Sequence, residues 1–338
     1  MCSDDRAWIR LTGTKIDPLL RQILAVVEYF PIGSVIVAKI ETELTDCGSL
    51  YSTNEYSFLE SCQLMVVNKV EGVAKNNSFA RFSMNFGLLI IAVFLLPVLI
   101  SVARHTLSDN QQKSWWELRR DSSLQAPAPA EYTDAVIQVY AARAARWRGA
   151  FGVHTWIAVK PRGATDYTRI EVMGYALRWS GSTVRIRQGS PDGYWFGSKP
   201  WLLRDIRGGA DVDEMIDRLI SAAENYPYDK QYRVWPGPNS NTFIATLARQ
   251  VPELRLELPP TAVGKDYLPN GQIFADAPSD SGVQLSVRGL LGLMIAAEEG
   301  VEMNLLGLTA GVDFSPLAIK LPGMGRIGNN DYQSREID

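Results

Sequence analysis

The longest apolar run in the chain lies between residues 86 and 103. It reads FGLLIIAVFLLPVLISVA and carries no charged side chain. A helix of about eighteen residues is just long enough to cross a hydrocarbon core about 30 Å thick, and Pro97 is tolerated in such a helix. The run therefore predicts a single transmembrane helix over residues 84–105, with membrane lipid as its partner from Phe86 to Ala103. The alternative is a buried core helix, although a fully apolar helix of this length is uncommon inside a domain of this size.

The segments around this run are less regular. Residues 1–83 contain apolar stretches without a repeating period, which predicts a poorly defined N-terminal extension, and the alternative is that the natural start is Met84. Residues 106–133 carry paired tryptophans and an Ala-Pro run, which predict a linker with a contact at the membrane surface and a semi-rigid spacer. Residues 329–338 are polar, which predicts a loose tail.

Residues 134–328 have the pattern of a soluble α+β domain. Short alternating segments predict an antiparallel sheet of successive hairpins, in which His154, Trp156 and Ala158 share one face. Two amphipathic segments predict helices packed on that sheet. An aliphatic region predicts further strands that pair with the same sheet. The predicted strands cover residues 135–140, 152–160, 168–177 and 182–188, the helices cover 211–226 and about 239–249, and the further strands cover 283–308.

Composition and charge exclude several classes of function. Hydrophobic residues make up 46% and charged residues 21% of the chain, as in ordinary globular proteins. The net charge of −3 gives no basic field that favours nucleic acid. The three cysteines, Cys2, Cys47 and Cys62, lack metal-binding spacing and leave the rest of the chain without a thiol. We therefore expect no metal, no cofactor and no cysteine nucleophile in the domain.

The stretch at residues 235–249, WPGPNSNTFIATLAR, is the one around which candidate chemistry gathers. Pro238 restricts Gly237 to an extended or turn conformation, and Asn239 and Ser240 are strong N-cap residues. A polar side chain at the positive end of a helix suits a nucleophile or an anion site. It is also an ordinary way to begin a helix.

His154 and Ser240 form the candidate catalytic pair. A nucleophile needs a base within hydrogen-bond reach, and Glu171 on the next strand is the candidate for the group that orients that base. A lone strand histidine is more often structural, and an exposed strand carboxylate is the plain alternative for Glu171. The candidate substrate-binding residues are Asn239 and Asn241, beside the free N–H groups of the helix, and Trp235, which can instead pack the turn.

The domain resembles a bacterial family known only as domain of unknown function 3750. The matching pieces are AVIQVYAAR, WRGAFGVHTWIAVK, the YPY before RVWPGPNSNTF, LPPTAVGKDYLP and NLLGLTAGVD. Members of that family carry a membrane segment ahead of the domain. This resemblance supports Met84 as a natural start and leaves residues 1–83 without a counterpart.

A more distant resemblance is to the circularly permuted papain-like superfamily, which contains NlpC-type cell-wall peptidases and lecithin:retinol acyltransferase-like enzymes. The run from Asn239 to Phe243, NSNTF, is similar to their NCxxF motif, with Ser240 in place of cysteine. The resemblance implies a permuted papain-like core and a hydrolase or acyltransferase that acts on amide or ester bonds of cell-wall or lipid substrates. Because a serine hydroxyl ionises far less than a thiol, the alternative is a catalytically inactive binding or scaffolding domain.

The predicted location is a single-pass membrane protein of the cell envelope with an extracytoplasmic (periplasmic) domain. Positive charges on the two sides of the apolar run nearly balance, so a cytoplasmic domain remains the alternative. The sequence leaves the oligomeric state open.

Overall fold

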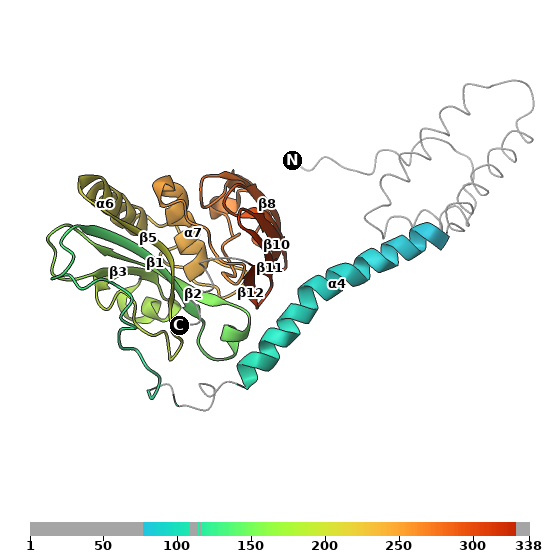
Figure 1. Cartoon of the computed structure of the whole chain (residues 1–338), viewed down its shortest axis with the longest axis horizontal. Helices are drawn as coiled ribbons and strands as arrows, with labels where there is room; N and C mark the ends of the chain where they lie inside the picture. The colour runs from blue at the N-terminus through green and yellow to red at the C-terminus, as the bar shows by residue number, and fades with distance from the viewer. Residues whose placement is uncertain (1–76, 108–113, 115, 329–338) are drawn as a thin grey trace, which may run out of the picture. The chain divides into compact units, whose positions relative to one another are not determined.

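The computed structural model describes residues 77–107, 114 and 116–328 (Figure 1), of which those from Phe86 onward belong to one compact unit. The predictions for residues 1–76 and for the tail at 329–338 lie outside the described residues.

Helix α4 (Asn77–Thr106) contains the predicted apolar helix and begins earlier than residue 84. Its segment Gly87–Thr106 is long and apolar enough to cross a membrane. Large side chains such as Leu95 and Leu99 are exposed along it, whereas a helix in a soluble core would bury them. Near the C-terminal end, the Ser101 hydroxyl lies 2.6 Å from the carbonyl oxygen of Ala150 and 2.8 Å from that of Gly323. These contacts fix the end of α4 to the domain.

The first sheet has five antiparallel strands in the order β4-β3-β2-β1-β5. Its first four strands confirm the predicted hairpins, while the fifth was not predicted. The third strand stops at Val172 because a 3₁₀ turn, η4 (Gly174–Ala176), and the one-turn helix α5 (Leu177–Ser180) follow. The strands are β1 (Ala135–Arg143), β2 (Val153–Lys160), β3 (Thr168–Val172), β4 (Val184–Gln188) and β5 (Trp201–Gly208).

Both faces of the first sheet are buried. Helices α6 (Ala210–Glu224) and α7 (Ser240–Gln250) confirm the two predicted helices and cover one face, where Ile157, Leu219 and Phe243 pack in the main core. The other face holds Tyr140, Trp156 and Ala158 in a smaller cluster, on the side that the alternation predicted. Because apolar side chains fill both sides, this sheet is a rigid support for the side chains at the ends of its strands.

The predicted linker is bound to the domain where the structure describes it, at residues 116–133. Asp192 accepts hydrogen bonds there from the hydroxyl groups of Ser122 and Ser123 and from the backbone N–H of Gln125. Tyr132 and Ala126 pack on the smaller cluster of the first sheet. The Ala-Pro run thus lies between a segment bonded to Asp192, in the connection from β4 to β5, and Tyr132, which packs on the first sheet.

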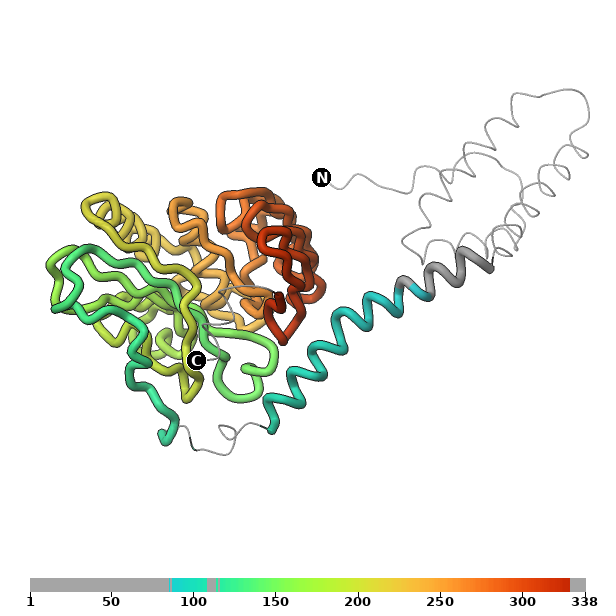
Figure 2. Tube along the Cα trace, in the orientation of Figure 1, coloured from blue at the N-terminus to red at the C-terminus, as the bar shows by residue number. Residues whose placement is uncertain are grey.

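A second sheet of seven antiparallel strands follows α7, and each strand pairs with the next. This part of the chain is the orange-to-red end of the trace in Figure 2. The prediction that residues 283–308 pair with the first sheet is wrong. The short turns between these strands allow each strand to pair with the next one along the chain. The second sheet therefore forms from these strands alone, without a strand of the first sheet. Its strands are β6 (Phe274–Asp276), β7 (Gly282–Val287), β8 (Leu291–Ala296), β9 (Gly300–Leu305), β10 (Leu308–Phe314), β11 (Leu317–Leu321) and β12 (Gly325–Gly328).

Candidate functional site

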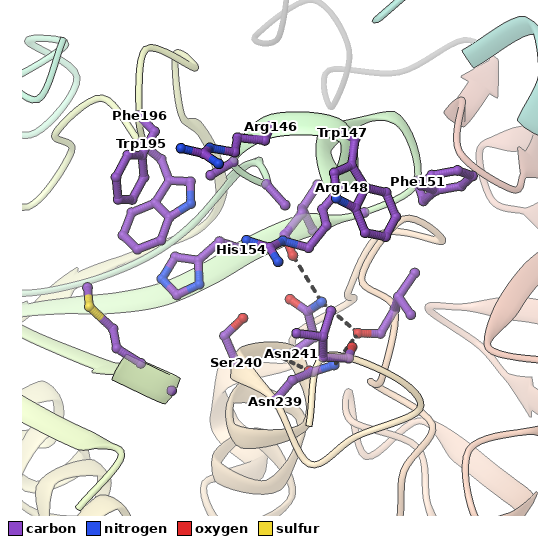
Figure 3. Close-up of a pocket in the computed structure, with 18 of the residues that line it drawn as sticks. Arg146, Trp147, Arg148, Phe151, His154, Trp195, Phe196, Asn239, Ser240 and Asn241 are labelled. Carbon is purple, nitrogen blue, oxygen red and sulfur yellow. Dashed lines mark hydrogen bonds between the residues drawn. The ribbon is translucent and has the colours of Figure 1, made fainter. Parts of the chain in front are cut away.

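A cleft of about 1430 Å³ lies at the N-terminal end of α7. It brings together five of the six candidate residues, which come from β2, from the turn before α7 and from α7 itself (Figure 3). The 3₁₀ turn η3 (Arg146–Ala150), the segment with Trp195 and Phe196, the β9–β10 turn and His105 of α4 complete its walls. The five residues are His154, Trp235, Asn239, Ser240 and Asn241.

The turn and cap before α7 hold Ser240 at the floor of the cleft. The side-chain oxygen of Asn239 accepts hydrogen bonds from the backbone N–H groups of Asn241 (2.9 Å) and Thr242 (3.2 Å). The Thr242 hydroxyl accepts the backbone N–H of Asn239 at 3.1 Å, which completes a capping box. Gly237 has φ = 135°, and a Cβ there would lie 2.8 Å from the Thr242 hydroxyl oxygen. Glycine is therefore required at this turn.

The amide groups of Asn239 and Asn241 are used within the protein. Asn239 donates to the carbonyl oxygens of Val234 and Val263, each at 3.0 Å. Asn241 donates to the carbonyl oxygens of Val153 (3.1 Å) and Val263 (2.8 Å) and accepts from a hydroxyl on β2. A substrate contact would have to displace these bonds, so both residues act first to position the start of α7. The backbone N–H of Ser240, by contrast, donates no hydrogen bond to another described residue.

His154 is held from two sides at the cleft wall. Its Nε2 lies 3.3 Å from Oε2 of Glu171, and its ring stacks on Trp195 with 3.7 Å between ring centres. Glu171 lies behind the histidine and outside the cleft lining, and Arg169 donates to the same carboxylate oxygen at 2.9 Å. Glu171 is fully buried, so its alternative reading as an exposed strand carboxylate is wrong.

The pKa shifts in this group follow from burial and charge. Burial lowers the pKa of His154, and the hydrogen bond to Glu171 only partly opposes this. Burial alone would raise the pKa of Glu171, but the hydrogen bond from His154 and the charge of Arg169 outweigh it, so the pKa is lowered. The pair at neutral pH is therefore an uncharged imidazole beside a carboxylate.

Ser240 and His154 face the same cleft, as Figure 3 shows, but no hydrogen bond joins them in the described part of the chain. Burial raises the pKa of Tyr232, while the charge of Arg148 and a hydrogen bond with Ser240 oppose that rise. The Ser240 hydroxyl thus has a phenol as its neighbour. Trp235 lines the cleft with 53% of its surface exposed and donates from Nε1 to the Leu306 carbonyl oxygen at 2.8 Å.

Sequence reasoning missed Arg169, Trp195 and Arg148, and it assigned Tyr232 to packing of the turn before α7. Arg169 carried a readable signal, since Arg169 and Glu171 are two positions apart on one predicted strand and must share a face. Trp195 and Arg148 reach the site from separate segments, and local pattern does not reveal such approaches.

Comparison with family models adds the identity of the domain. The family described as protein of unknown function (DUF3750) matches residues 134–267. Residues 134–267 of this chain belong to the DUF3750 family. The matched part contains the first sheet, α6, α7 and all six candidate residues, and it stops before the second sheet. No curated protein and no solved structure matches the chain.

Proposed function

We propose that this protein is a membrane-anchored hydrolase or acyltransferase in which Ser240 attacks the carbonyl carbon of an ester or amide. The observation that carries the proposal is the buried His154–Glu171 pair, which faces the cleft where Ser240 begins α7. A base held by a carboxylate, beside a hydroxyl at a helix N-terminus, is the arrangement that nucleophilic catalysis requires.

The proposed chemistry uses the two ring nitrogens of His154 differently. Nε2 carries its proton toward Glu171, which leaves the lone pair of Nδ1 to accept the Ser240 proton. As the Ser240 oxygen bonds to the carbonyl carbon, the proton moves to Nδ1 and then to the departing alcohol or amine. Water or an acceptor alcohol next enters by the reverse sequence and releases the acyl group from the serine. Before the attack, the Ser240 hydroxyl turns from Tyr232 toward His154 and forms a hydrogen bond to Nδ1, directly or through one water.

The negative charge that develops on the carbonyl oxygen needs nearby donors. The free backbone N–H of Ser240 at the positive end of α7 is the first candidate. Arg148 lies close enough to act on Tyr232, and it lines the same cleft. We assign the stabilisation of this oxygen to the Ser240 N–H and Arg148 and not to the side-chain amides of Asn239 and Asn241. Those amides already donate hydrogen bonds to backbone carbonyl oxygens within the protein.

The lining of the cleft favours a lipid substrate over a peptide. Trp147, Phe151 and Leu306 offer an apolar wall for an acyl chain, and Arg146 offers a cation for an anionic head group. His105, at the end of the helix that can cross a membrane, lines the same cleft. A permuted papain-like core, a bacterial envelope location and an extracytoplasmic domain belong to this proposal and rest on the resemblances given by the sequence.

A specific observation also favours a second function, that of a binding domain without catalysis. The Ser240 hydroxyl has Tyr232 as its neighbour, no hydrogen bond joins it to His154 among the described residues, and Trp195 covers one face of the imidazole. The same cleft would then hold a lipid head group without cleaving it.

Labelling with a fluorophosphonate probe tests the proposal on the full-length protein in detergent. We expect labelling that disappears in Ser240→Ala and His154→Ala. The cleft supplies matched controls, because Ser198 and His105 line it too, and Ser198→Ala and His105→Ala are expected to keep the label. Labelling that survives Ser240→Ala would overturn the assignment of the nucleophile.

The variant Ser240→Cys separates a wrong geometry from an unreactive serine. If His154 is a competent base, the new thiol reacts with iodoacetamide faster than a free cysteine below pH 8, and His154→Ala removes that excess. A thiol that reacts at the ordinary rate, together with no fluorophosphonate label, would favour the binding domain.

A further inference from the structure

The second sheet carries its apolar side chains on the outside. Strand pairing places Leu285, Leu293 and Met303 side by side across β7, β8 and β9, and Val283 lies opposite Ile295 in the next row. The rows continue through Ile319 and Ile327 on β11 and β12. The following residues of this face are each between 41% and 68% exposed: Phe274, Val283, Leu285, Val287, Leu291, Leu293, Ile295, Met303, Phe314, Leu317, Ile319 and Ile327.

The opposite face of the same sheet is buried and charged. Glu302 pairs with Lys265 and, at 2.8 Å, with Lys320. Lys320 also contacts Asp313 at 2.8 Å, and Asp313 pairs with Arg326. Burial alone would lower the pKa of Lys320, but the surrounding carboxylates outweigh it and raise the pKa. The inner face is therefore held together by ion pairs, beside a small apolar cluster of Ala277, Met294 and Ala296.

An apolar outside over a polar inside is the reverse of a sheet that stands in water. One-sided antiparallel sheets in soluble proteins bury apolar residues and expose polar ones. Contiguous exposed apolar patches on soluble monomers rarely exceed a few hundred Å², and a face spread over seven strands marks a contact surface. Among its paired positions, the charged residue on this face is Asp276, at the end of edge strand β6.

Two observations identify the contact as lipid. Alternation with apolar residues outward and polar residues inward is the pattern of strands that face acyl chains. The second observation is continuity with the apolar helix, since Ser101 of α4 is bonded to the carbonyl oxygen of Gly323 in the β11–β12 turn. A helix that is long and apolar enough to cross a bilayer is thus fixed at the edge of the apolar face.

We propose that the outer face of the second sheet lies in the acyl-chain layer of the membrane that α4 crosses. This inference rests on the proposed membrane anchoring. It also deepens the proposed function, because Leu306 and Leu308 of the same sheet line the cleft, so a lipid can reach Ser240 along the sheet without passing through water.

Depth-dependent quenching tests this inference on the full-length protein in lipid vesicles. Cys2, Cys47 and Cys62 are replaced by serine, and single cysteines are introduced by Leu293→Cys or Ile319→Cys on the sheet. Ile91→Cys reports on α4, and Glu224→Cys, on the exposed side of α6, is the control for a position in water. Each cysteine is labelled with bimane, and fluorescence is compared between vesicles with and without brominated phosphatidylcholine.

We expect loss of fluorescence at Leu293→Cys, Ile319→Cys and Ile91→Cys, and none at Glu224→Cys. Quenching at Ile91→Cys without quenching at either sheet position would overturn this inference and leave the anchor standing. Absence of quenching at Ile91→Cys would overturn the anchor itself. Bismaleimide coupling of Leu293→Cys into dimers, without quenching, would assign the face to a second copy of the chain instead.

Discussion

The two sheets of this protein solve the problem of burial in opposite ways. The first sheet buries aliphatic and aromatic side chains on both faces, and an ionic group of Glu171 with Arg169 and His154 lies where the sheet meets a cleft. The second sheet buries ion pairs and exposes aliphatic residues. A buried charge is tolerated when it is paired, and a large contiguous apolar face on the outside marks a contact surface. Under the two proposals made above, the first sheet is the scaffold for the chemistry and the second sheet is the surface for contact.

The largest effect should come from breaking the ionic interior of the second sheet. Glu302→Gln leaves Lys265 and Lys320 with one charge fewer between them, and we expect a loss of about 3–5 kcal/mol in the free energy of unfolding. Urea unfolding of the full chain in detergent measures it. Glu298→Gln is the control, because its pair with Arg255 is partly exposed and should contribute less than about 1 kcal/mol. If Glu302→Gln and Glu298→Gln lost the same unfolding free energy, the buried ion pairs would not be what stabilises this sheet.

A matched pair of isoleucines sharpens the difference between the sheets. Ile157→Ala on β2 removes a fully buried side chain and should cost about 2–5 kcal/mol in unfolding free energy. Ile295→Ala on β8 removes a side chain that is 53% exposed, and it should cost less than about 1 kcal/mol. The same unfolding assay compares them. A large loss at Ile295 would show that another part of the protein covers the outer face.

The cap of α7 is expected to give a smaller loss of stability with a larger loss of function. Asn239→Ala removes the acceptor of two helix N–H groups and should cost about 0.5–2 kcal/mol. Because the cap positions Ser240, fluorophosphonate labelling should fall as well. Asn239→Asp keeps the acceptor for the helix N–H groups but loses both donated hydrogen bonds to the carbonyl oxygens of Val234 and Val263, so it separates the contribution of the cap from that of those bonds. Full labelling in Asn239→Ala would remove Asn239 from the positioning of the nucleophile.

The smallest expected effect concerns the pH dependence of fluorophosphonate labelling. The labelling rate should stay constant in the pH range where an ordinary histidine becomes protonated. The lowered pKa of His154 keeps its imidazole uncharged as pH falls through the ordinary value near 6.5, so the labelling rate should hold there and decline only at lower pH. In Glu171→Gln the hydrogen bond that favours the charged imidazole is weakened, so the decline should move to still lower pH. A decline centred at or above pH 6.5 in the unmodified protein would contradict the buried, neutral base.

Local sequence determined several of the elements of this protein, although β5 and the early end of β3 were not predicted from it. The hairpins of the first sheet, α6, the Asn239 cap and the apolar helix all follow from residue spacing, because period, capping residues and charge-free length are properties of neighbouring residues. The placement of His154 with Trp156 on one face also follows, since alternate residues of a strand share a face.

Tertiary structure decided which faces are buried and which segments meet. Alternation along β7 to β11 shows that the two faces differ, but it does not say which one points inward, and here Glu302 and Lys320 are inside. Glu171 was compatible with exposure until Arg169 and His154 enclosed it. Trp195 reaches His154 from a turn about 40 residues away, which no local period encodes. The physical reason is that burial depends on what the rest of the chain brings to a surface, whereas periodicity records only that a surface exists.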